Sequence, residues 1–381
     1  MKQNKHLQQG MTLIEILISL VIGLVLMAGV ISLMINSKRA YNVQNDLAGL
    51  QENSRFVVNA IAKDARMAGY QGCSGGLSPA IQGLNNQTVG GDGTVSSSIT
   101  SDVLLISFAD TSRNAFAIMH CPPFEVYGQL FGLTSTAYDA VCLPVGNENF
   151  PSPTPLMADK TTFTFDSTVV PTFADCNQTL TGTACFGIGG DLQKGDTVIV
   201  SDCNGSDRYQ VGNVGFTGGR LTSVTLATGL TRNYFNGGQS YGSEMRRLVT
   251  HRYYVAGVDG RSVICRDTLA LNADLTCNVT NGAEVLVEGV ENMQLRYLMN
   301  NGSDTAPNFQ YVTAPNVTNW EQVRGVRMTL LMQTTESRTD RDTNSQTYSL
   351  DEDSGFNNYT PKDLNRLRRV FSNTIMLRNR S

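Results

Sequence analysis

MTLIEILISLVIGLVLMAGVISLMI, residues 11–35, is the stretch that decides the fold, because it is almost wholly apolar and has one charged side chain, Glu15. As a helix rising about 1.5 Å per residue it can cross the roughly 30 Å hydrocarbon core of a bilayer. In an ordinary secretory leader the cleavage site follows a shorter apolar run, whereas here the small residue Gly10 precedes the run. Cleavage after Gly10 would leave this helix on the mature protein.

Glu15 is the one carboxylate in the run. An ionised acid in hydrocarbon costs at least about 2.5 to 3.5 kcal/mol on insertion scales, so we expect a compensating partner. After cleavage at Gly10, the new α-amine of Met11 would lie one helical turn from Glu15, on the same chain or on a neighbouring helix. The alternative is that Glu15 lies at headgroup depth. One helical face also carries a stripe of polar and small residues suited to close helix contact. The stripe consists of Thr12, Glu15, Ser19 and Gly23.

The helical pattern continues past the membrane-length run. No proline occurs before Pro79, and apolar residues recur mostly at spacings of three, four or seven. We therefore expect one helix from Thr12 to about Met67, ended by Gly69 and Gly72. At roughly 80 Å it would be far longer than a bilayer is thick, so its second half should lie against a sheet. The repeating apolar residues are Val43, Leu47, Leu50, Val57 and Ile61.

All eight cysteines follow the apolar run. An even number confined to the exported side indicates disulfides. No pair has CxxC spacing and the chain has only three histidines, so we expect neither a structural metal nor a cofactor. Short separations favour the pairs Cys176 with Cys185 and Cys265 with Cys277, and the pairing of the other four stays open. The disulfide candidates are Cys73, Cys121, Cys142, Cys176, Cys185, Cys203, Cys265 and Cys277.

Beyond Cys73 the sequence predicts a mostly antiparallel β domain. Short runs of β-forming residues are bounded by Gly, Asn, Asp and Pro, and stretches rich in small polar residues between them predict surface loops. The fold class is therefore α+β, a long N-terminal helix packed on a large, disulfide-containing β head. Expected strands are 103–108, 197–200, 223–227, 248–255, 285–290 and 326–332. Expected loops are 84–98, 231–242 and 335–358.

The charge of the chain does not favour nucleic acid. Its formal net charge is −4, and loss of residues 1–10, which hold Lys2 and Lys5 but no acid, lowers the 29 Lys and Arg to 27 against 33 Asp and Glu, a net charge of −6. A C-terminal basic group could contact DNA during uptake or flank a terminal strand, and we favour the strand. The group comprises Arg366, Arg368, Arg369, Arg378 and Arg380.

No catalytic pattern stands out. GxSxG, HExxH and P-loop motifs are missing from the sequence, and neither His120 nor His251 has a nucleophile pattern near it, so we do not expect an enzyme. His251, in an alternating run with Tyr253 and Tyr254, is expected to be a strand residue satisfied locally. Two acidic groups could supply calcium ligands, but neither matches a twelve-residue calcium loop, and solvated loops are expected instead. They are Asp202, Asn204 and Asp207, and Asp340, Asp342, Asp351, Glu352 and Asp353.

The string Gly10-Met11-Thr12-Leu13-Ile14-Glu15 before an unbroken apolar helix resembles the class III leader of type IV pilins and type II secretion pseudopilins. The resemblance implies that a prepilin peptidase in the membrane cuts after Gly10 and methylates the new N-terminus at Met11, where the family usually has phenylalanine. It also implies that Glu15 is the carboxylate required for assembly. The implied division is a leader at 1–10, a transmembrane helix at 11–36, an exported half-helix at 37–72 and a β-rich head at 73–381.

Blocks in the head are similar to PilW-type minor pilins. Such a protein is implied to prime pilus assembly with other minor pilins and the major pilin, and to sit at or near the tip, supporting twitching, adhesion or DNA uptake. Its implied partners also include the inner-membrane assembly platform and a large tip adhesin, with the head periplasmic until assembly. The alternatives are a J-type pseudopilin of type II secretion and a tip adhesin module. The similar blocks are 66–73, 195–203, 290–295, 323–327 and 368–379.

Overall fold

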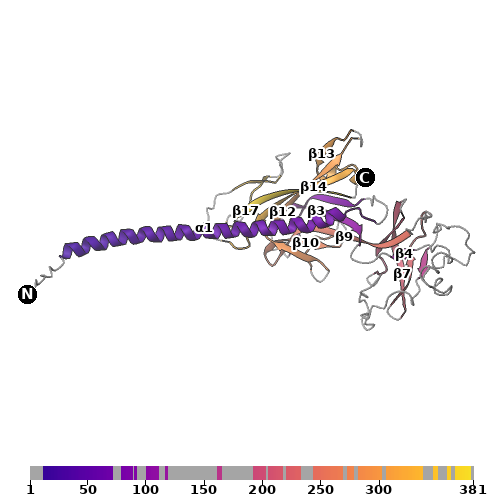
Figure 1. Cartoon of the computed structure of the whole chain (residues 1–381), viewed down its shortest axis with the longest axis horizontal. Coiled ribbons are helices and arrows are strands. Elements are labelled where there is room, and N and C mark those ends of the chain that lie inside the picture. The colour runs from indigo at the N-terminus through magenta and orange to yellow at the C-terminus, as the bar shows by residue number, and fades with distance from the viewer. Residues whose placement is uncertain are drawn as a thin grey trace, which may run out of the picture.

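In a computed structural model of the chain, one helix projects from a β-rich head (Figure 1). The helix is α1 (Leu13–Met67), and the head is built from antiparallel strands. The predicted α+β architecture is therefore confirmed. The structure describes residues 12–71, 79–88, 90–91, 100–110, 116–118, 161–164, 192–202, 205–217, 220–232, 243–268, 273–278, 282–302, 306–337, 346–350, 358–361 and 365–378.

Helix α1 begins and ends where the sequence predicts. Thr12 is the N-cap, and its hydroxyl accepts a 3.4 Å hydrogen bond from the Glu15 backbone N–H. The helix ends at Met67, and Gly69 follows with φ of 77°, a left-handed conformation that glycine adopts without a Cβ clash. The 55 residues between span roughly 80 Å. Gly72, the second expected stop, lies outside the described residues.

The two halves of α1 have different surroundings. Every residue from Thr12 to Tyr41 is exposed, and the first buried side chain is Leu50. From Leu50 onward one face of the helix is buried at spacings of three and four, as expected of a helix lying on a sheet. The predicted stripe extends less far back than expected, because Val43 remains 39 % exposed. The buried residues of α1 are Leu50, Ser54, Val57, Ile61, Ala62, Asp64 and Ala65.

Two sheets form most of the head. The smaller sheet has the order β13-β12-β14-β17. Helix α1 contacts β14 and β17 of this sheet, and β3 and β11 of the larger one. Its strands are β13 (Phe309–Val312), β12 (Val290–Asn300), β14 (Val323–Gln333) and β17 (Arg368–Met376).

The larger sheet has the order β1-β3-β9-β6-β7-β8-β5, with β10 on β9 and β11 beyond it. Short strands β2 (Gly90–Gly91) and β4 (Phe116–Ile118) also pair with β9, while β15 (Tyr348–Ser349) and β16 (Asn358–Tyr359) form a separate pair. The main strands are β1 (Ile81–Thr88), β3 (Thr100–Ala109), β5 (Thr162–Thr164), β6 (Thr197–Asp202), β7 (Gly205–Thr217), β8 (Arg220–Leu226), β9 (Ser243–Val258), β10 (Arg261–Asp267) and β11 (Glu284–Glu288).

Among the described residues, the two largest hydrophobic cores divide the head. The main core joins the buried face of α1 to both sheets, and we call the part around it the proximal head. A smaller core lies among β6, β7, β8 and the start of β9, and we call this part the distal lobe. The distal lobe lies at the end of the molecule away from the N-terminus (Figure 1). Its core residues are Leu192, Val198, Val200, Tyr209, Val211, Val224, Leu226, Leu230 and Met245.

Five of the six predicted strands are confirmed, and one needs correction. The run 285–290 is not one strand, because Gly289 separates β11 from β12 with φ of 84°. A Cβ at Gly289 would lie 2.4 Å from the Gln333 carbonyl oxygen, so only glycine fits this break. The loop expected at 84–98 was also wrong at its start, since β1 extends to Thr88 and β2 follows. The loop expected at 335–358 contains β15 and the first residue of β16.

Candidate functional site: the bare stem and its anchorage

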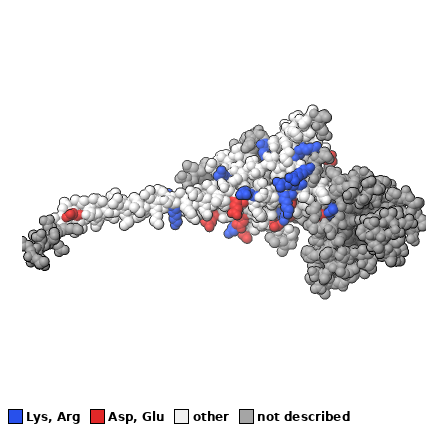
Figure 2. Space-filling model, viewed as in Figure 1, with Lys and Arg blue, Asp and Glu red and all other residues white. Residues whose placement is uncertain are grey.

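The exposed first half of α1 is the candidate assembly surface. It is long and apolar enough to cross a membrane, by length and composition, and it is the one such helix among the described residues. No charged residue occurs between Glu15 and Lys38. Figure 2 accordingly shows a nearly uncharged stem, with most described charges gathered over the second half of the helix and the head.

The expected contact stripe lies on this stem. Glu15 is exposed in the first turn, where the helix dipole favours an acid. The Ser19 hydroxyl donates a 2.7 Å hydrogen bond to the Glu15 carbonyl oxygen, and a Cβ added at Gly23 would meet nothing within 4 Å. A neighbouring helix could therefore approach closely here. Gly10 and Met11, the expected cleavage and methylation residues, lie outside the described residues.

At the other end of α1, Asp64 anchors the helix to the sheet. The carboxylate of Asp64 accepts a hydrogen bond from the Tyr253 hydroxyl and shares one with His251 Nδ1, both on β9. Arg266 of β10 places Nη1 4.0 Å from the same carboxylate, and its Nη2 donates a 2.5 Å bond to Glu284. Two strands, β9 and β10, therefore contact one carboxylate of α1.

The electrostatics of this cluster keep Asp64 ionised. Burial opposes its charge, but the hydrogen bonds with His251 and Tyr253 and the nearby Arg266 outweigh burial and lower the pKa of Asp64 below its usual value. Burial, followed by the charge of Asp64, raises the pKa of Tyr253, so its hydroxyl remains a donor. His251 is a strand residue as predicted, but its expected local satisfaction was wrong, because its partner lies 187 positions away in α1.

The chain leaving α1 is also fixed to the sheet. Gly69 N–H donates to the Ser107 carbonyl at 3.1 Å, and Ala109 N–H donates to the Tyr70 carbonyl at 2.7 Å. The Gln71 amide oxygen accepts a hydrogen bond from the Ser206 hydroxyl of the distal lobe. The segment that follows the helix therefore contacts both β3 and the distal lobe.

Side chains on β3 join the two sheets of the proximal head. Asp102 is buried and accepts backbone N–H bonds from Asn86 of β1 at 2.8 Å and Leu295 of β12 at 2.7 Å. The Ser101 hydroxyl accepts from Met293 N–H at 3.0 Å and donates to its carbonyl at 3.1 Å. Burial raises the pKa of Asp102 to about 7 despite the N–H donors.

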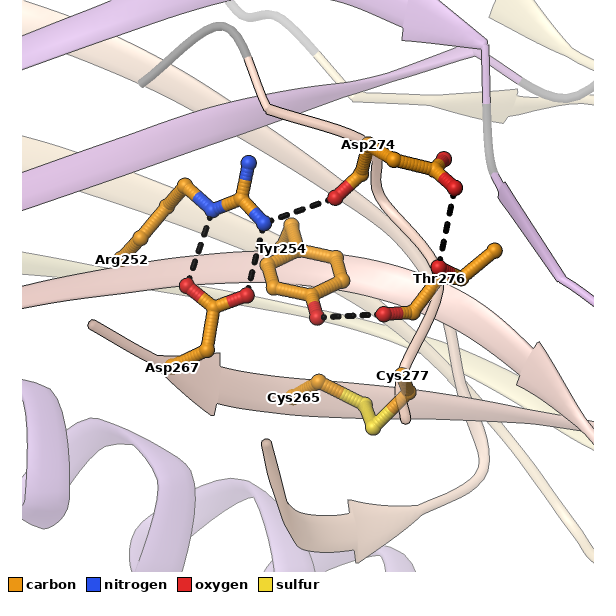
Figure 3. The surroundings of a disulfide bond; sticks show 7 residues. All are labelled: Arg252, Tyr254, Cys265, Asp267, Asp274, Thr276 and Cys277. Carbon is orange, nitrogen blue, oxygen red and sulfur yellow. Dashed lines mark hydrogen bonds and ion pairs between the residues drawn. A yellow bond between two sulfur atoms is a disulfide. The ribbon is translucent and has the colours of Figure 1, made fainter. Parts of the chain in front are cut away.

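A buried ion pair and the disulfide hold the segment after β10 (Figure 3). Arg252 and Asp267, at most 1 % exposed in their side chains, form two hydrogen bonds of 2.9 and 2.6 Å. Arg252 also donates to the carbonyls of Ala273 and Asp274 at 2.7 and 2.8 Å. The predicted pair of Cys265 and Cys277 is confirmed, and it closes the same segment onto β10.

The C-terminal basic group is partly structural. Arg368 opens β17 and is buried against Glu291 of β12, with bonds of 2.5 and 3.2 Å. Tyr359 of β16 donates to the same carboxylate at 2.8 Å. The expected terminal strand is confirmed as β17: Arg368 and Arg369 begin it, and Arg366 and Arg378 flank it. Arg380 lies outside the described residues.

Among the described residues, no group of three or more His, Cys, Asp or Glu could hold a metal. Of the residues weighed as calcium ligands, six lie outside the described residues: Asn204, Asp340, Asp342, Asp351, Glu352 and Asp353. Asp207, a calcium candidate, bonds to Arg232 at 2.8 Å. Six disulfide candidates lie outside the described residues: Cys73, Cys121, Cys142, Cys176, Cys185 and Cys203.

Sequence reasoning missed the anchoring groups Asp64, Arg252 and Glu291. Asp64 could have been found, because it lies seven residues after Val57 and therefore on the buried face of the helix. Arg252 follows His251 in a strand and so points to the opposite face, and nothing in the sequence spacing identifies Asp267 as its partner.

Two family models match parts of the chain. Residues 252–379 match the family model for type IV pilus-assembly protein W, and residues 5–31 match the prokaryotic N-terminal methylation motif. No curated protein matches the chain. The first match begins within β9 and extends past the end of β17, and the second covers the start of the stem, where Glu15 lies.

Proposed function

We propose that this chain, which joins the prepilin methylation motif to the PilW-type domain of type IV minor pilins, is a pilus subunit. It helps to initiate pilus assembly and sits at or near the pilus tip. It is held in the inner membrane with its head in the periplasm until it is extracted into the pilus. The matched family is a structural assembly protein, so the proposed activity is assembly and not catalysis. Twitching, adhesion or DNA uptake would depend on the pili it helps to build.

The observation that carries the proposal is the division of α1. The head covers the helix from Leu50 onward and leaves residues 12–41 exposed. Such a length of exposed apolar helix is not stable in water, because about 25 cal/mol is lost for each Å² of apolar surface left there. A bilayer before assembly and neighbouring stems after it provide the two environments that cover this surface.

Glu15 supplies the proposed contact between stems. Cleavage after Gly10 would create the α-amine of Met11, and in an apolar surrounding the carboxylate of Glu15 would attract that amine on a neighbouring subunit. Buried charge pairs fix register more than they add affinity. The role of Glu15 is therefore to align one stem with the next, together with the open surface at Gly23.

The experiment compares Glu15→Ala with the wild-type chain in a strain that lacks the gene. Removing the charge eases membrane insertion, so Glu15→Ala should be present in membranes at normal levels and cleaved. It should be lost from sheared pili and fail to restore piliation and twitching. Ser19→Ala is the matched control, because it removes a polar group of the same stripe without a charge. Full complementation by Glu15→Ala, or its degradation, would contradict the assembly role.

The same strains separate the two alternative functions. A pseudopilin of type II secretion would leave piliation intact and reduce protein secretion when deleted, so secretion is measured in parallel. A tip adhesin would leave pili present in the deletion strain but unable to bind their surface ligand. Loss of pili with normal secretion is the result expected for an initiating minor pilin.

A further inference from the structure

The chain leaves and re-enters the proximal head at one place. Strands β3 and β9 are antiparallel neighbours, paired from Leu104 opposite Tyr253 to Ala109 opposite Leu248. Just beyond this ladder, Asp110 N–H donates a 2.9 Å hydrogen bond to the Arg247 carbonyl. Two such strands can be joined by a two-residue turn. Here residues 111–246 take the place of that turn.

The described part of this insertion has a hydrophobic core of its own. Val198 and Val200 of β6, Tyr209 of β7 and Val224 of β8 are at most 2 % exposed, and they cluster with one another and not with the residues that pack on α1. The last core member, Met245, lies on the insertion's side of Arg247. The distal lobe therefore buries the side chains of this core without help from the proximal head, and Ile199 is the lobe residue that packs on the proximal head instead.

Among the described residues, the distal lobe and the proximal head share little apolar contact, and their other contacts are polar or through the backbone. Ile199 is the lobe residue in a small apolar cluster with Tyr70, Ala109 and Leu248. The polar links include the Ser206 bond to Gln71 and a 3.1 Å bond from Arg208 to the Pro79 carbonyl. They also include a 3.4 Å bond from Arg246 to the Asp110 carbonyl and a 3.3 Å ion pair between Asp196 and Arg247. Arg246 stacks over the Tyr70 ring, and the β6–β9 ladder reaches the pair of Val198 with Arg247. The apolar part of this junction is small compared with the hydrophobic core on either side.

We infer that the distal lobe is an accessory module inserted into the β3–β9 hairpin, and that α1 and the proximal head fold and enter pili without it. The assembly half of this inference rests on the proposed function. The match to the pilus-assembly family begins at residue 252, after the insertion, and the lobe lies at the end of the molecule away from the stem (Figure 1). The distal lobe is therefore placed to contact other molecules and not the stems of neighbouring subunits.

A hairpin variant tests the inference in the full-length protein. Residues 111–246 are replaced by Asn-Gly, which favours the two-residue turn that would join Asp110 to Arg247. Cys73→Ser is added because five of the disulfide candidates are removed with the insertion, and the matched control is the full-length chain with Cys73→Ser alone. In detergent, the hairpin variant should unfold cooperatively, keep the Cys265–Cys277 disulfide, and show amide exchange rates in β12 and β14 within about threefold of the control.

A second pair of variants keeps the lobe in place. Val224→Asp puts a charge in the lobe core, and Leu330→Asp puts the same charge in the proximal core; both positions are fully buried. Val224→Asp should speed exchange in β6 to β8 by at least about a hundredfold and leave β12 and β14 within about threefold of wild type. Leu330→Asp should abolish protection in β12 and β14. Loss of protection in β12 and β14 with Val224→Asp would overturn the separate module.

Assembly is then scored separately from folding. A hairpin variant that folds and restores pili in the deletion strain supports both halves of the inference. One that aggregates while its control folds would show that the lobe is part of the head's fold. One that folds but leaves cells without pili, beside a wild-type chain that restores them, would assign assembly to the lobe. If the wild-type chain itself restores no pili, the proposed function fails, while the exchange data still decide the module.

Discussion

Asp64 of α1 and Tyr253 of β9 meet beneath the helix, where the Tyr253 hydroxyl donates a hydrogen bond to the Asp64 carboxylate. Tyr253 is fully buried and Asp64 is 6 % exposed, so neither group can exchange this partner for water. Each residue of a helix turns about 100°, so any rotation of α1 by one residue would remove Asp64 from the sheet. The contact therefore fixes the rotation of α1 about its own axis relative to the head, and with it the direction in which each face of the exposed stem points.

Asp64→Ala should lower the free energy of unfolding by about 1 to 3 kcal/mol, because it leaves the Tyr253 hydroxyl and His251 without their shared acceptor. Glu52→Ala, an exposed acid on the same helix, is the control and should change stability by less than about 0.5 kcal/mol. Urea unfolding of the full chain in detergent measures both. Equal effects of the two substitutions would contradict the anchoring role. In Tyr253→Phe protein, Asp64→Ala should cost less, since the two groups are coupled.

The helix, its ends and most of the β character could be predicted from the sequence, because these depend on local signals. Thr12 and Gly69 set the two ends of the helix through local backbone geometry. Runs of β-branched residues favour strands irrespective of which strand they pair with. The sequence could not predict which strands pair. The β3–β9 pairing closes a loop of more than a hundred residues, and nothing local at Ala109 indicates that Leu248 lies opposite.

The candidate site shows the same division. The stripe around Glu15 could be predicted from the sequence, because a single acid within an apolar run stands out from its neighbours. The anchoring contacts of the head could not be predicted, because they join residues that are far apart in the chain, such as Glu291 and Arg368. Disulfide prediction succeeded for Cys265 and Cys277 because only 12 positions separate them.

Processing of the leader is predicted at one bond. Gly10 is the small residue at the boundary between the polar start and the apolar run, and the N-terminal methylation motif covers it. Mass spectrometry of mature wild-type protein should find an N-terminus at Met11 carrying one methyl group. Gly10→Val should accumulate uncleaved, while Gln9→Ala should be processed normally. A mature wild-type chain that retains residues 1–10 would contradict the leader assignment.

The cysteines are predicted to be oxidised in the envelope. Alkylation without reduction should leave few or no labelled thiols, whereas alkylation after reduction should label eight. With Cys265 bound to Cys277, six candidates remain, of which Cys73 alone lies before the insertion at 111–246. Five is an odd number, so complete pairing requires a bond from Cys73 into the insertion. Non-reduced peptide mapping should find that cross-link, and eight freely labelled thiols would refute the prediction.

Asp102 is predicted to make the proximal head less stable as pH rises. Burial raises its pKa to about 7 in the folded protein, against an ordinary value of 3.8. The folded state therefore keeps a proton that the unfolded state has lost between about pH 4 and 7, and the free energy of unfolding falls across this window by at most about 1.4 kcal/mol per pH unit. Asp64 acts in the opposite direction, but only below its ordinary pKa of 3.8, because its pKa is lowered. The two effects therefore occupy different pH ranges.

Asp102→Asn isolates this effect, because the amide has nearly the shape of the carboxyl but does not titrate. Asparagine offers one acceptor oxygen where Asp102 bonds both Asn86 and Leu295, so the variant should be less stable at every pH. The decisive quantity is the slope of unfolding free energy against pH, which should be less negative between pH 4 and 7 in Asp102→Asn than in wild type. Subtracting the two curves removes the contribution of every titrating group that the substitution leaves unchanged. Chemical unfolding at five or six pH values measures the slopes, with Asp259→Asn, on the turn between β9 and β10, as an exposed control that should leave the slope unchanged. Parallel curves for wild type and Asp102→Asn would mean that Asp102 is ionised throughout, with its two backbone donors outweighing burial.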